Sequence, residues 1–303
     1  MKSTFYSNGK LLITAEYLVL DGATALALPT KFGQNLVVEA GNHNQIHWTS
    51  FDNDGSIWFE DFISFEEIIQ KTRFENKIFK NTLIEILHEA YLLNHDFITN
   101  SNGYKITTNL TFSRFWGLGT SSTLINNIAQ WLQIDAFVLL KNSFGGSGYD
   151  IACAQNNNPI LFQLDCGNPI ITKVNFEPEF SRKVYFVYLN KKQSSKEAIA
   201  NYYKKKNDLT VVIPLIDSVT RNILNAKDYK FFAAELQKHE NIMSEILEMK
   251  TIQEILFPDF KGVVKSLGAW GGDFALVVAD KNPSDYFISK GFATIIPFSK
   301  MIL

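Results

Sequence analysis

The chain has 303 residues, of which 46% are hydrophobic, and its formal net charge is -2 from 29 basic and 31 acidic side chains. This length predicts one large or two medium domains, and the hydrophobic fraction excludes a disordered chain. Because the charge lacks the basic excess of a nucleic-acid binder, we expect no nucleic-acid partner.

The N-terminal residues and the cysteines indicate the cellular compartment in which the protein is expected. The chain begins MKSTFYSNGKLLITAEYLVL, in which Lys10 and Glu16 interrupt the apolar positions, so it does not resemble a secretory signal. No uncharged apolar run approaches the length of a membrane span. The two cysteines, Cys153 and Cys166, form no C-x-x-C pair. We therefore expect a cytoplasmic protein without a membrane partner.

The first hundred residues predict short strands and one helix. A short strand over Leu11 to Thr14 is expected after an Asn8-Gly9 turn, and Asp21-Gly22 predicts a second turn. An antiparallel meander is expected from three apolar runs, Leu36 to Glu39, Gln45 to Phe51 and Ile57 to Phe59. Helical spacing then predicts a core-facing stripe of Ile78, Phe79, Leu83, Ile86, Leu87 and Ala90.

The most informative stretch runs from Thr111 to Leu132 and follows a strand expected over Tyr104 to Leu110. It reads TFSRFWGLGTSSTLINNIAQWL, a glycine turn and a hydroxyl cluster before an apolar helical face. The hydroxyl residues are candidates for the N-cap of this helix. A glycine turn entering a helix also presents unpaired N–H groups that suit phosphate. An ordinary capped helix remains the alternative reading of this pattern alone.

The remaining chain mixes strands with helices. A second glycine-rich entry, FGGSGYDIACAQ, covers Phe144 to Gln155, and a polar segment near Glu177 suggests a domain boundary. Helices are expected from the capping-box pattern Ser194-x-x-Glu197, around Pro214, and over Tyr229 to Leu247. Strands are expected over Pro159 to Leu164, Val184 to Leu189, Gly262 to Lys265, Phe274 to Ala279 and Phe292 to Phe298. This order predicts an α+β protein with domains at residues 1–176 and 177–303.

Four motifs, taken together and in this order, resemble those of the GHMP kinases, the family of galactokinase, homoserine kinase, mevalonate kinase and phosphomevalonate kinase. The strings are SNGKLLITAEYLVLDGATALAL, GLGTSST, GYDIA and LGAWGGDFAL, and GYDIA matches a subgroup known by that string. The resemblance spans nearly the whole chain. It implies a two-domain GHMP kinase fold, with an N-terminal domain like domain 2 of ribosomal protein S5 and a ferredoxin-like C-terminal domain.

The resemblance also implies an enzyme that uses ATP and Mg²⁺ for phosphoryl transfer, in which the protein supplies N–H groups and cations. Asp150 is implied as the catalytic base and Lys10 as the cation between acceptor and γ-phosphate. The implied ATP-binding residues are Gly117, Leu118, Gly119, Thr120, Ser121 and Ser122, with Ser121 (or Thr120) near the metal. The implied substrate contacts are Glu16, Ser147, Gly148, Tyr149, Ser194, Ser195, Lys196, Gly268, Gly271 and Gly272.

Several positions depart from the family pattern. The segment from Lys141 to Tyr149 contains no acid, although mevalonate and galactose kinases place a magnesium-binding glutamate upstream of the aspartate. In the third motif, Trp270 replaces a small residue and Asp273 adds an acid.

The acceptor is expected to be a mevalonate-pathway acid, either phosphomevalonate or mevalonate. Tyr17 follows Glu16, where phosphomevalonate kinases often carry tyrosine, and Lys191, Lys192 and Lys196 could hold an anion beside the helix start at Ser194–Ser195. A solvated basic loop is an equal alternative for these lysines. A non-catalytic sensor, a kinase for another small alcohol, and a homodimer are also left open.

Overall fold

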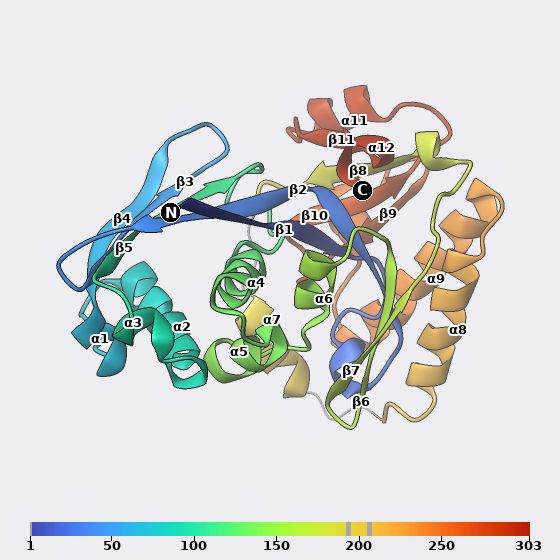
Figure 1. Ribbon diagram of the computed structural model, residues 1–303. Coiled ribbons are helices and arrows are strands. Elements are labelled where there is room, and N and C mark those ends of the chain that lie inside the picture. The colour runs from blue at the N-terminus through green and yellow to red at the C-terminus, as the bar shows by residue number, and fades with distance from the viewer. Residues whose placement is uncertain (1, 192–194, 205–207) are drawn as a thin grey trace. The chain divides into compact units, whose positions relative to one another are not determined.

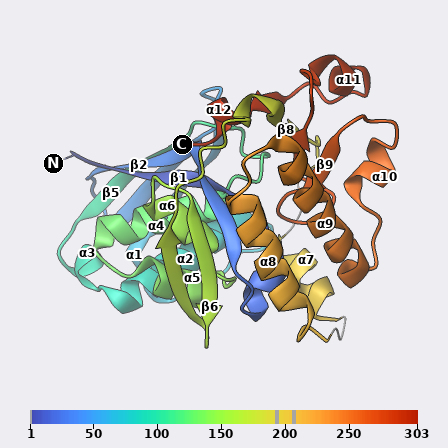
Figure 2. The same cartoon turned by 90° about the vertical axis from the view of Figure 1, so that its right-hand side faces the viewer.

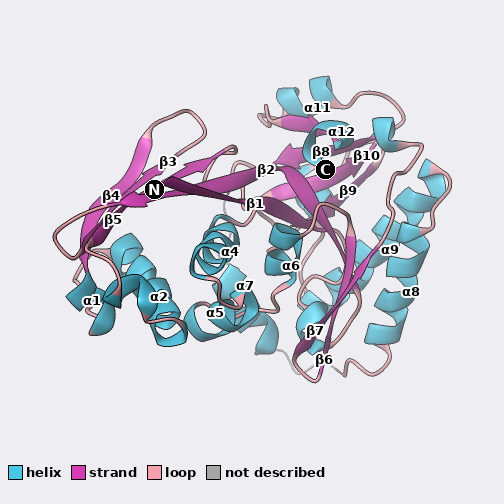
Figure 3. Cartoon of the chain, in the orientation of Figure 1, coloured by secondary structure: helices cyan, strands magenta, loops and turns pink. Residues whose placement is uncertain are grey.

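The computed structural model of the protein describes residues 2–191, 195–204 and 208–303 (Figure 1). Helices and strands are mixed along the chain, which confirms the predicted α+β class (Figure 3). Two compact units share the chain. The first contains Met1–Gly9, Phe32–Arg114 and Leu118–Gln155, and the second contains Lys10–Lys31, Phe115–Gly117 and Asn156–Leu303. The domain boundary predicted from the sequence, between residues 176 and 177, remains a prediction.

The first unit is a sheet with helices on one face (Figure 1). Its strands lie in the order β4 (Ile57–Ser64), β3 (Gln45–Phe51), β5 (Gly103–Leu110), β2 (Ala25–Ala40), and β1 (Lys2–Leu12) pairs with β2. Its helices are α1 (Phe65–Ile69), α2 (Ile78–Leu93), α3 (Asp96–Thr99), α4 (Thr120–Leu132), α5 (Ala136–Ser143) and α6 (Tyr149–Gln155). Leu36 and Trp48 of the sheet share one buried core with Leu87, Ile128 and Ile151 of the helices.

The expected meander is wrong, because β5 lies between β2 and β3. Strand β3 pairs antiparallel with β4 but parallel with β5, and β2 pairs antiparallel with β5. Two glycines allow the backbone at the start of β5 to lie close to the segment that joins β2 to β3. A Cβ at Gly41 would lie 2.6 Å from the backbone of Tyr104, and one at Gly103 would lie 2.6 Å from the carbonyl oxygen of Asn42. Sequence periodicity reveals that strands exist but carries no information on such distant pairing.

Two further local predictions are wrong. The Asn8-Gly9 pair is not a turn, because β1 continues through it and ends at Leu12, so the expected strand over Leu11 to Thr14 does not begin there. The helical stripe on α2 is confirmed at Leu83, Ile86, Leu87 and Ala90. Ile78 and Phe79, however, are 76% and 57% exposed, because the first turn of α2 lies beyond the edge of the core.

The second unit contains an antiparallel sheet in the order β11 (Ile295–Pro297), β8 (Val184–Tyr188), β10 (Phe274–Val278), β9 (Val263–Ser266). Taken in chain order these strands have the spatial order 4-1-3-2, with helical segments after the first and third strands. This is the ferredoxin-like arrangement that was expected for the C-terminal part of the chain. A hairpin of β6 (Ile160–Asp165) and β7 (Asn168–Lys173) extends from the first residues of β2 in the same unit.

Helices of the second unit flank these strands. They are α7 (Ser195–Tyr203), α8 (Val212–Leu224), α9 (Tyr229–Leu247), α10 (Ile252–Leu256), α11 (Ser284–Ser289) and α12 (Phe298–Met301), with short 3-10 turns η1 (Leu18–Asp21) and η2 (Ser181–Lys183). Helices α8 and α9 lie side by side (Figure 2), and α9 also packs on β9. The helix predicted over Tyr229 to Leu247 is confirmed at both ends. No helix among the described residues is long and apolar enough to span a bilayer.

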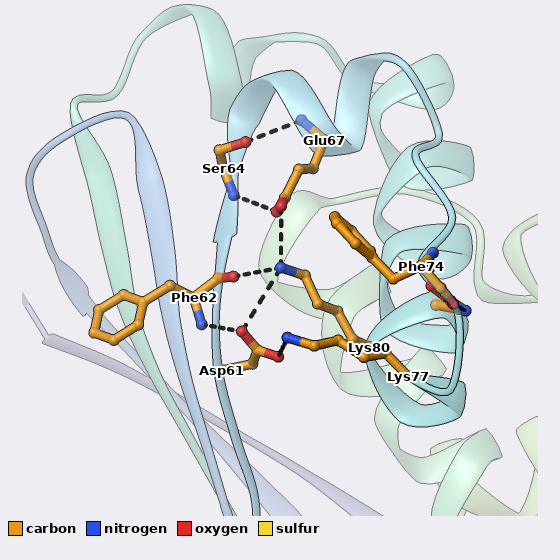
Figure 4. Close-up of polar contacts among 8 residues, drawn as sticks. Asp61, Phe62, Ser64, Glu67, Phe74, Lys77 and Lys80 are labelled. Carbon is orange, nitrogen blue, oxygen red and sulfur yellow. Dashed lines mark hydrogen bonds and ion pairs between the residues drawn. The ribbon is translucent and has the colours of Figure 1, made fainter.

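A buried lysine joins β4, α1 and α2 of the first unit (Figure 4). The ammonium group of Lys80 donates to the Phe62 carbonyl at 2.8 Å and to Glu67 Oε1 at 3.0 Å, and it lies 3.6 Å from Asp61 Oδ1. It also lies 4.5 Å from the centre of the Phe74 ring. Because β4 is the outer strand, the bond to Phe62 occupies a carbonyl that an unpaired edge would leave exposed.

Lys80→Met is expected to lower the free energy of unfolding by about 2–3 kcal/mol, because the change removes a buried cation from the partly buried carboxylates of Asp61 and Glu67 and from the Phe62 carbonyl. The control is Lys77→Met, since Lys77 pairs with the same Asp61 at 3.0 Å but is half exposed. That pair should contribute less than about 1 kcal/mol. Urea unfolding of both variants measures the difference, and equal losses would contradict a structural role for the buried lysine.

Candidate active site

The glycine and hydroxyl segment forms a turn that ends in the first residue of α4. Gly117 and Gly119 have φ values of 66° and 97°, which lie in the left-handed region that favours glycine. Gly119 is the N-cap residue, and no side chain caps the helix. The predicted capping by hydroxyl residues is therefore wrong. An N-cap without a side-chain acceptor leaves the first N–H groups of α4 available to an anion.

The hydroxyl groups after Gly119 are not equivalent. Ser122 and Thr123 are buried, and their hydroxyls donate to the Gly119 carbonyl at 2.9 and 3.0 Å. Gln34 Oε1, 2.7 Å away, is a second acceptor that shares the single proton of the Thr123 hydroxyl. Thr120 and Ser121 are half exposed. Of the hydroxyls predicted for nucleotide or metal contact, Thr120 and Ser121 are therefore better placed to reach a ligand than Ser122.

The second glycine-rich entry leads into α6, which packs on α4 in the same unit. Gly148 is buried with φ 91°, and its carbonyl accepts the first helical bond from Ala152 at 3.0 Å. Asp150 is half exposed in the first turn, where its Oδ1 accepts the Ile151 N–H at 3.2 Å. Ser147 and Tyr149 beside it are also half exposed. A carboxylate with access to solvent at a helix start can accept a proton from a bound acceptor.

In the second unit, the first motif contains a strained turn. Ala15 and Tyr17 have φ values of 62° and 63°, which non-glycine residues rarely adopt. The turn is held at three places: Ala15 N donates to His239 Nε2 at 2.8 Å, Glu16 pairs with Lys265, and the Tyr17 hydroxyl accepts the Trp270 N–H at 2.9 Å. Lys10, half buried near the end of β1, lies five residues before this turn.

Glu16 belongs to a buried ionisable cluster with His239, Glu240 and Lys265. Lys265 Nζ donates to Glu16 Oε1 at 2.5 Å and to the Ser266 carbonyl at 2.8 Å. Glu240 Oε1 accepts the Ser266 N–H at 3.0 Å. Each of the four ionisable residues is at most 3% exposed. Glu16 therefore has a structural partner, and its predicted contact with substrate remains a prediction.

Charge in this cluster is unevenly balanced. His239 Nε2 lies 3.4 Å from Glu16 Oε2, but the same nitrogen accepts the Ala15 N–H bond, and burial holds the pKa of His239 well below its ordinary value. The imidazole is therefore neutral, and its contact with Glu16 is not an ion pair. The positive charge of Lys265 then acts on the carboxylates of both Glu16 and Glu240. Burial raises the pKa of Glu240 to about 7.

The cluster predicts a measurable pH dependence of stability. Because the folded pKa of Glu240 is raised, its protonated form stabilises the fold, and this contribution is lost as pH rises from its ordinary value near 4.5 to about 7. The depressed pKa of His239 acts in the opposite direction, so the comparison must be made between variants. Glu240→Gln, which mimics the protonated acid, should gain stability relative to the parent by up to about 1.4 kcal/mol per pH unit in this window.

Denaturant unfolding at several pH values measures this difference. Glu245→Gln is the matched control, because Glu245 is exposed on the same helix, α9. A constant difference between Glu240→Gln and the parent from pH 5 to 7 would show that Glu240 does not titrate in that range.

The third glycine loop joins β9 to β10. Gly268 and Gly271 are half exposed with φ values of 72° and 81°, whereas Gly272 is buried. Trp270 is 6% exposed, and its ring nitrogen donates to the Lys250 carbonyl at 3.1 Å. The bulky ring therefore folds into the interior of the second unit, while Gly268 and Gly271 remain half exposed.

Some predicted residues cannot be assigned contacts. Ser194 lies outside the described residues, and so does Lys192 of the predicted basic loop. Ser195 is the first residue of α7, but the side chains of Ser195 and Lys196 lie outside the described part of the protein. The predicted capping box and anion site there remain predictions.

Sequence reasoning missed His239, Glu240 and Lys265. The sequence did contain a sign of these residues, because His239 and Glu240 occupy positions on the apolar stripe of α9 between Leu236 and Met243. Lys265 similarly follows two valines in a strand whose last three residues are all buried. A charged residue at a core position is a stronger indication of a specific role than a charged residue on a surface.

The donors suit a metal that is shared with a nucleotide. Mg²⁺ prefers oxygen ligands and is commonly bound by one or two carboxylates together with phosphate oxygens. The described residues contain no group of three or more His, Cys, Asp or Glu able to hold a metal by themselves. Ser121 and Thr120 offer accessible hydroxyls at the start of α4. These hydroxyl oxygens fit a metal that arrives with ATP.

Comparison with known proteins identifies the fold. No family model and no curated sequence matches the chain. Among solved structures, it is similar to the mevalonate kinase of Methanococcus jannaschii, with 16% identity, TM-score 0.69, and 98% of this chain and 97% of that chain covered. It is similar to a phosphomevalonate kinase of Streptococcus pneumoniae, solved with phosphomevalonate and AMPPNP, with 15% identity, TM-score 0.70, and coverage of 96% and 97%. For a galactokinase of Lactococcus lactis with galactose, the identity is 11%, the TM-score 0.65, and the coverage 95% and 90%.

These matches cover nearly the full length of the chain and of each compared structure. The protein therefore has the fold of the GHMP kinases, as its motifs predicted. At such low identity the likeness shows the fold and leaves the substrate open.

Proposed function

We propose that this protein is an ATP- and Mg²⁺-dependent kinase that transfers the γ-phosphate of ATP to a mevalonate-pathway acid. The observation that carries the proposal is the start of α4, where Gly119 caps the helix without a side chain. Exposed N–H groups and the positive end of the helix dipole favour phosphate at such a position. The half-exposed hydroxyls of Thr120 and Ser121 follow directly and suit contacts to phosphate or its metal.

In this proposal the chain positions the reactants and moves one proton. For a hydroxyl acceptor, Asp150 accepts the O–H proton as the acceptor oxygen bonds to the γ-phosphorus and the bond to the β-phosphate oxygen breaks, releasing ADP. Lys10 stabilises the charge that develops between acceptor and phosphate. Bound Mg²⁺ would neutralise phosphate charge, and Ser121 is the hydroxyl proposed beside it.

Phosphomevalonate is favoured slightly over mevalonate as the acceptor. Tyr17 stands where phosphomevalonate kinases often carry tyrosine. Its hydroxyl is engaged by the Trp270 N–H, so the residue supports the third glycine loop. The compared phosphomevalonate kinase binds phosphomevalonate and AMPPNP, and it shares the fold over nearly its whole length.

The acceptor is tested by measuring ADP release with mevalonate, phosphomevalonate, galactose, homoserine and simple alcohols. Turnover of a mevalonate compound supports the proposal. Turnover of galactose or homoserine alone would reject the acceptor while keeping a kinase. Nucleotide binding without turnover of any acceptor would instead favour the alternative of a non-catalytic sensor.

The nucleotide site is tested with Gly119→Val. Valine is strained at a φ of 97° and would add bulk where N–H groups should meet phosphate. Calorimetry with a non-hydrolysable ATP analogue should show that binding is abolished. The control is Gly55→Val, at another glycine of positive φ in an open turn. Unchanged nucleotide affinity in a folded Gly119→Val protein would remove the loop from the site.

A further inference from the structure

The face of α4 that meets the sheet carries three buried polar side chains. Thr123, Asn126 and Asn127 are each at most 1% exposed. Their partners, Ser7 of β1 and Gln34 of β2, are equally buried, and all five residues belong to the first unit. Burying polar side chains costs free energy unless their hydrogen bonds are made. Apolar residues at these positions would hold the helix on the sheet without that cost, so adhesion alone does not explain the group.

These side chains bond the first two turns of α4 to two strands. Asn127 Nδ2 donates to the Gln34 carbonyl at 3.0 Å, and Asn127 Oδ1 accepts the Ser7 hydroxyl at 2.7 Å. Asn126 Nδ2 donates to Ser7 Oγ at 2.8 Å. Figure 1 shows α4 beside both strands. Because a hydrogen bond requires a particular distance and angle, these contacts fix how α4 is rotated and where it lies along its axis.

The contact between Thr123 and Gln34 is the one nearest to the start of the helix. The Thr123 hydroxyl has a single proton, and Gln34 Oε1 lies 2.7 Å from its oxygen. The carbonyl oxygens of Gly119 and Thr120 lie 3.0 and 3.1 Å from it. The Gly119 carbonyl already accepts the Thr123 N–H and the Ser122 hydroxyl, both at 2.9 Å. Gln34 Oε1 is therefore the acceptor that gains most from this proton, and the bond joins β2 to the turn that follows Gly119.

We propose that Gln34 and Thr123 are positioning residues for nucleotide binding, whose shared hydrogen bond holds the first turn of α4 in the orientation that directs its N–H groups at phosphate. The proposal rests on the proposed function, because it concerns the same site. Neither side chain touches the nucleotide in this role. N–H groups at a helix start bind an anion only where they point at it. In a preorganised site, a misplacement of about 1 Å can cost as much as 10²-fold.

A purely structural role predicts instead that nucleotide affinity follows stability. Thr123→Val leaves Gln34 Oε1 buried without this donor, so the variant should unfold at a lower urea concentration than the parent. Adding Gln34→Met removes the acceptor as well. Valine and methionine have nearly the shapes of threonine and glutamine, so the urea midpoint of the double variant should return toward that of the parent. The hydrogen bond does not return, and the nucleotide affinity of the double variant therefore separates the two roles.

The experiment measures the affinity of the full chain for AMPPNP in excess Mg²⁺, together with the urea midpoint, for the parent, Thr123→Val, Gln34→Met and the double variant. Thr123→Ser is the conservative variant, because serine keeps the hydroxyl. The matched control is Thr82→Val in α2 of the same unit. The Thr82 hydroxyl donates to the carbonyl of Ile78, four residues earlier, at 3.0 Å, which is the distance from the Thr123 hydroxyl to the Gly119 carbonyl.

We expect Thr123→Val and the double variant to bind AMPPNP roughly tenfold more weakly than the parent, and Thr123→Ser and Thr82→Val to stay within about twofold of it. A double variant that regains both the stability and the affinity of the parent would overturn the positioning role. Unchanged affinity in Thr123→Val would overturn it too, and so would a double variant less stable than Thr123→Val alone. These three outcomes leave the kinase proposal intact, whereas a parent protein that does not bind AMPPNP would overturn both.

Discussion

Asp150→Asn is expected to reduce kcat for phosphorylation of the mevalonate hydroxyl by roughly 10²–10⁴-fold, the usual contribution of a positioned base. Asparagine preserves the size of the side chain and can still accept the local N–H bond of Ile151, which lies 3.2 Å from Asp150 Oδ1. The start of α6 should therefore remain folded. Affinity for a non-hydrolysable ATP analogue should change little, because the proton is transferred only during the reaction.

The chemistry of the acceptor modifies this expectation. A phosphate acceptor has a second pKa near 6, so its attacking oxygen is already largely deprotonated at neutral pH. The loss with phosphomevalonate should therefore be much smaller than the loss with mevalonate. Measuring the variant with both acceptors shows whether Asp150 moves a proton or only positions the acceptor.

Steady-state kinetics and calorimetry together provide the test. Asp96→Asn is the matched control, since Asp96 is exposed in the first turn of another short helix of the same unit, α3. Turnover of mevalonate by Asp150→Asn within about threefold of the parent, far below the expected range, would show that the base assignment is wrong. Lys10→Met provides a second comparison, and it should reduce kcat more than ATP affinity.

Lys265→Met is expected to lower the free energy of unfolding by about 3–5 kcal/mol, because it leaves the Glu16 carboxylate buried without its cation. Lys265 is fully buried, and its ammonium group contacts Glu16 Oε1 at 2.5 Å. Burial raises the pKa of Glu16, an effect that the charge of Lys265 opposes. Without the lysine, Glu16 must either take up a proton or remain charged in the low-dielectric interior of the protein.

A double variant tests this explanation. Glu16→Gln combined with Lys265→Met removes both charges, so much of the lost stability should return. The control is Lys183→Met, because Lys183 pairs with Asp280 at the surface of the same unit. Chemical unfolding of the parent, Lys265→Met, the double variant and Lys183→Met gives the comparison. A double variant no more stable than Lys265→Met alone would show that the loss does not come from an uncompensated charge.

The sequence predicted the local elements where a regular pattern determined them. The apolar stripe from Phe232 to Ile246 gave α9 its correct bounds, because helical spacing depends only on neighbours three and four residues apart. The glycine turn before α4 was recognised from the closely spaced Gly117 and Gly119 that precede the apolar helical face. The resemblance to GHMP kinases then gave the fold, and the structural comparisons confirm it.

The sequence alone did not predict several contacts in the candidate site. It suggested that any of four hydroxyls after Gly119 could cap α4, yet Ser122 and Thr123 turn back to the Gly119 carbonyl, and Gly119 itself is the cap. It also showed only that Trp270 replaces a small residue in the third motif, whereas the structure shows that the ring is buried and that its nitrogen donates to the Lys250 carbonyl. The path of the backbone decides where the hydroxyls after Gly119 and the Trp270 ring point. The identity of these side chains alone does not specify that path.

The sequence by itself predicted candidate residues for phosphoryl transfer and the bounds of regular elements such as α9. Only the tertiary structure decided that β5 separates β2 from β3, that Lys265 neutralises Glu16, and that Asp273 lies against Gly117. The physical reason is the distance along the chain over which each effect acts. Propensity and periodicity act over a few residues, whereas these contacts join positions far apart in the chain that meet only when distant strands and turns pack together.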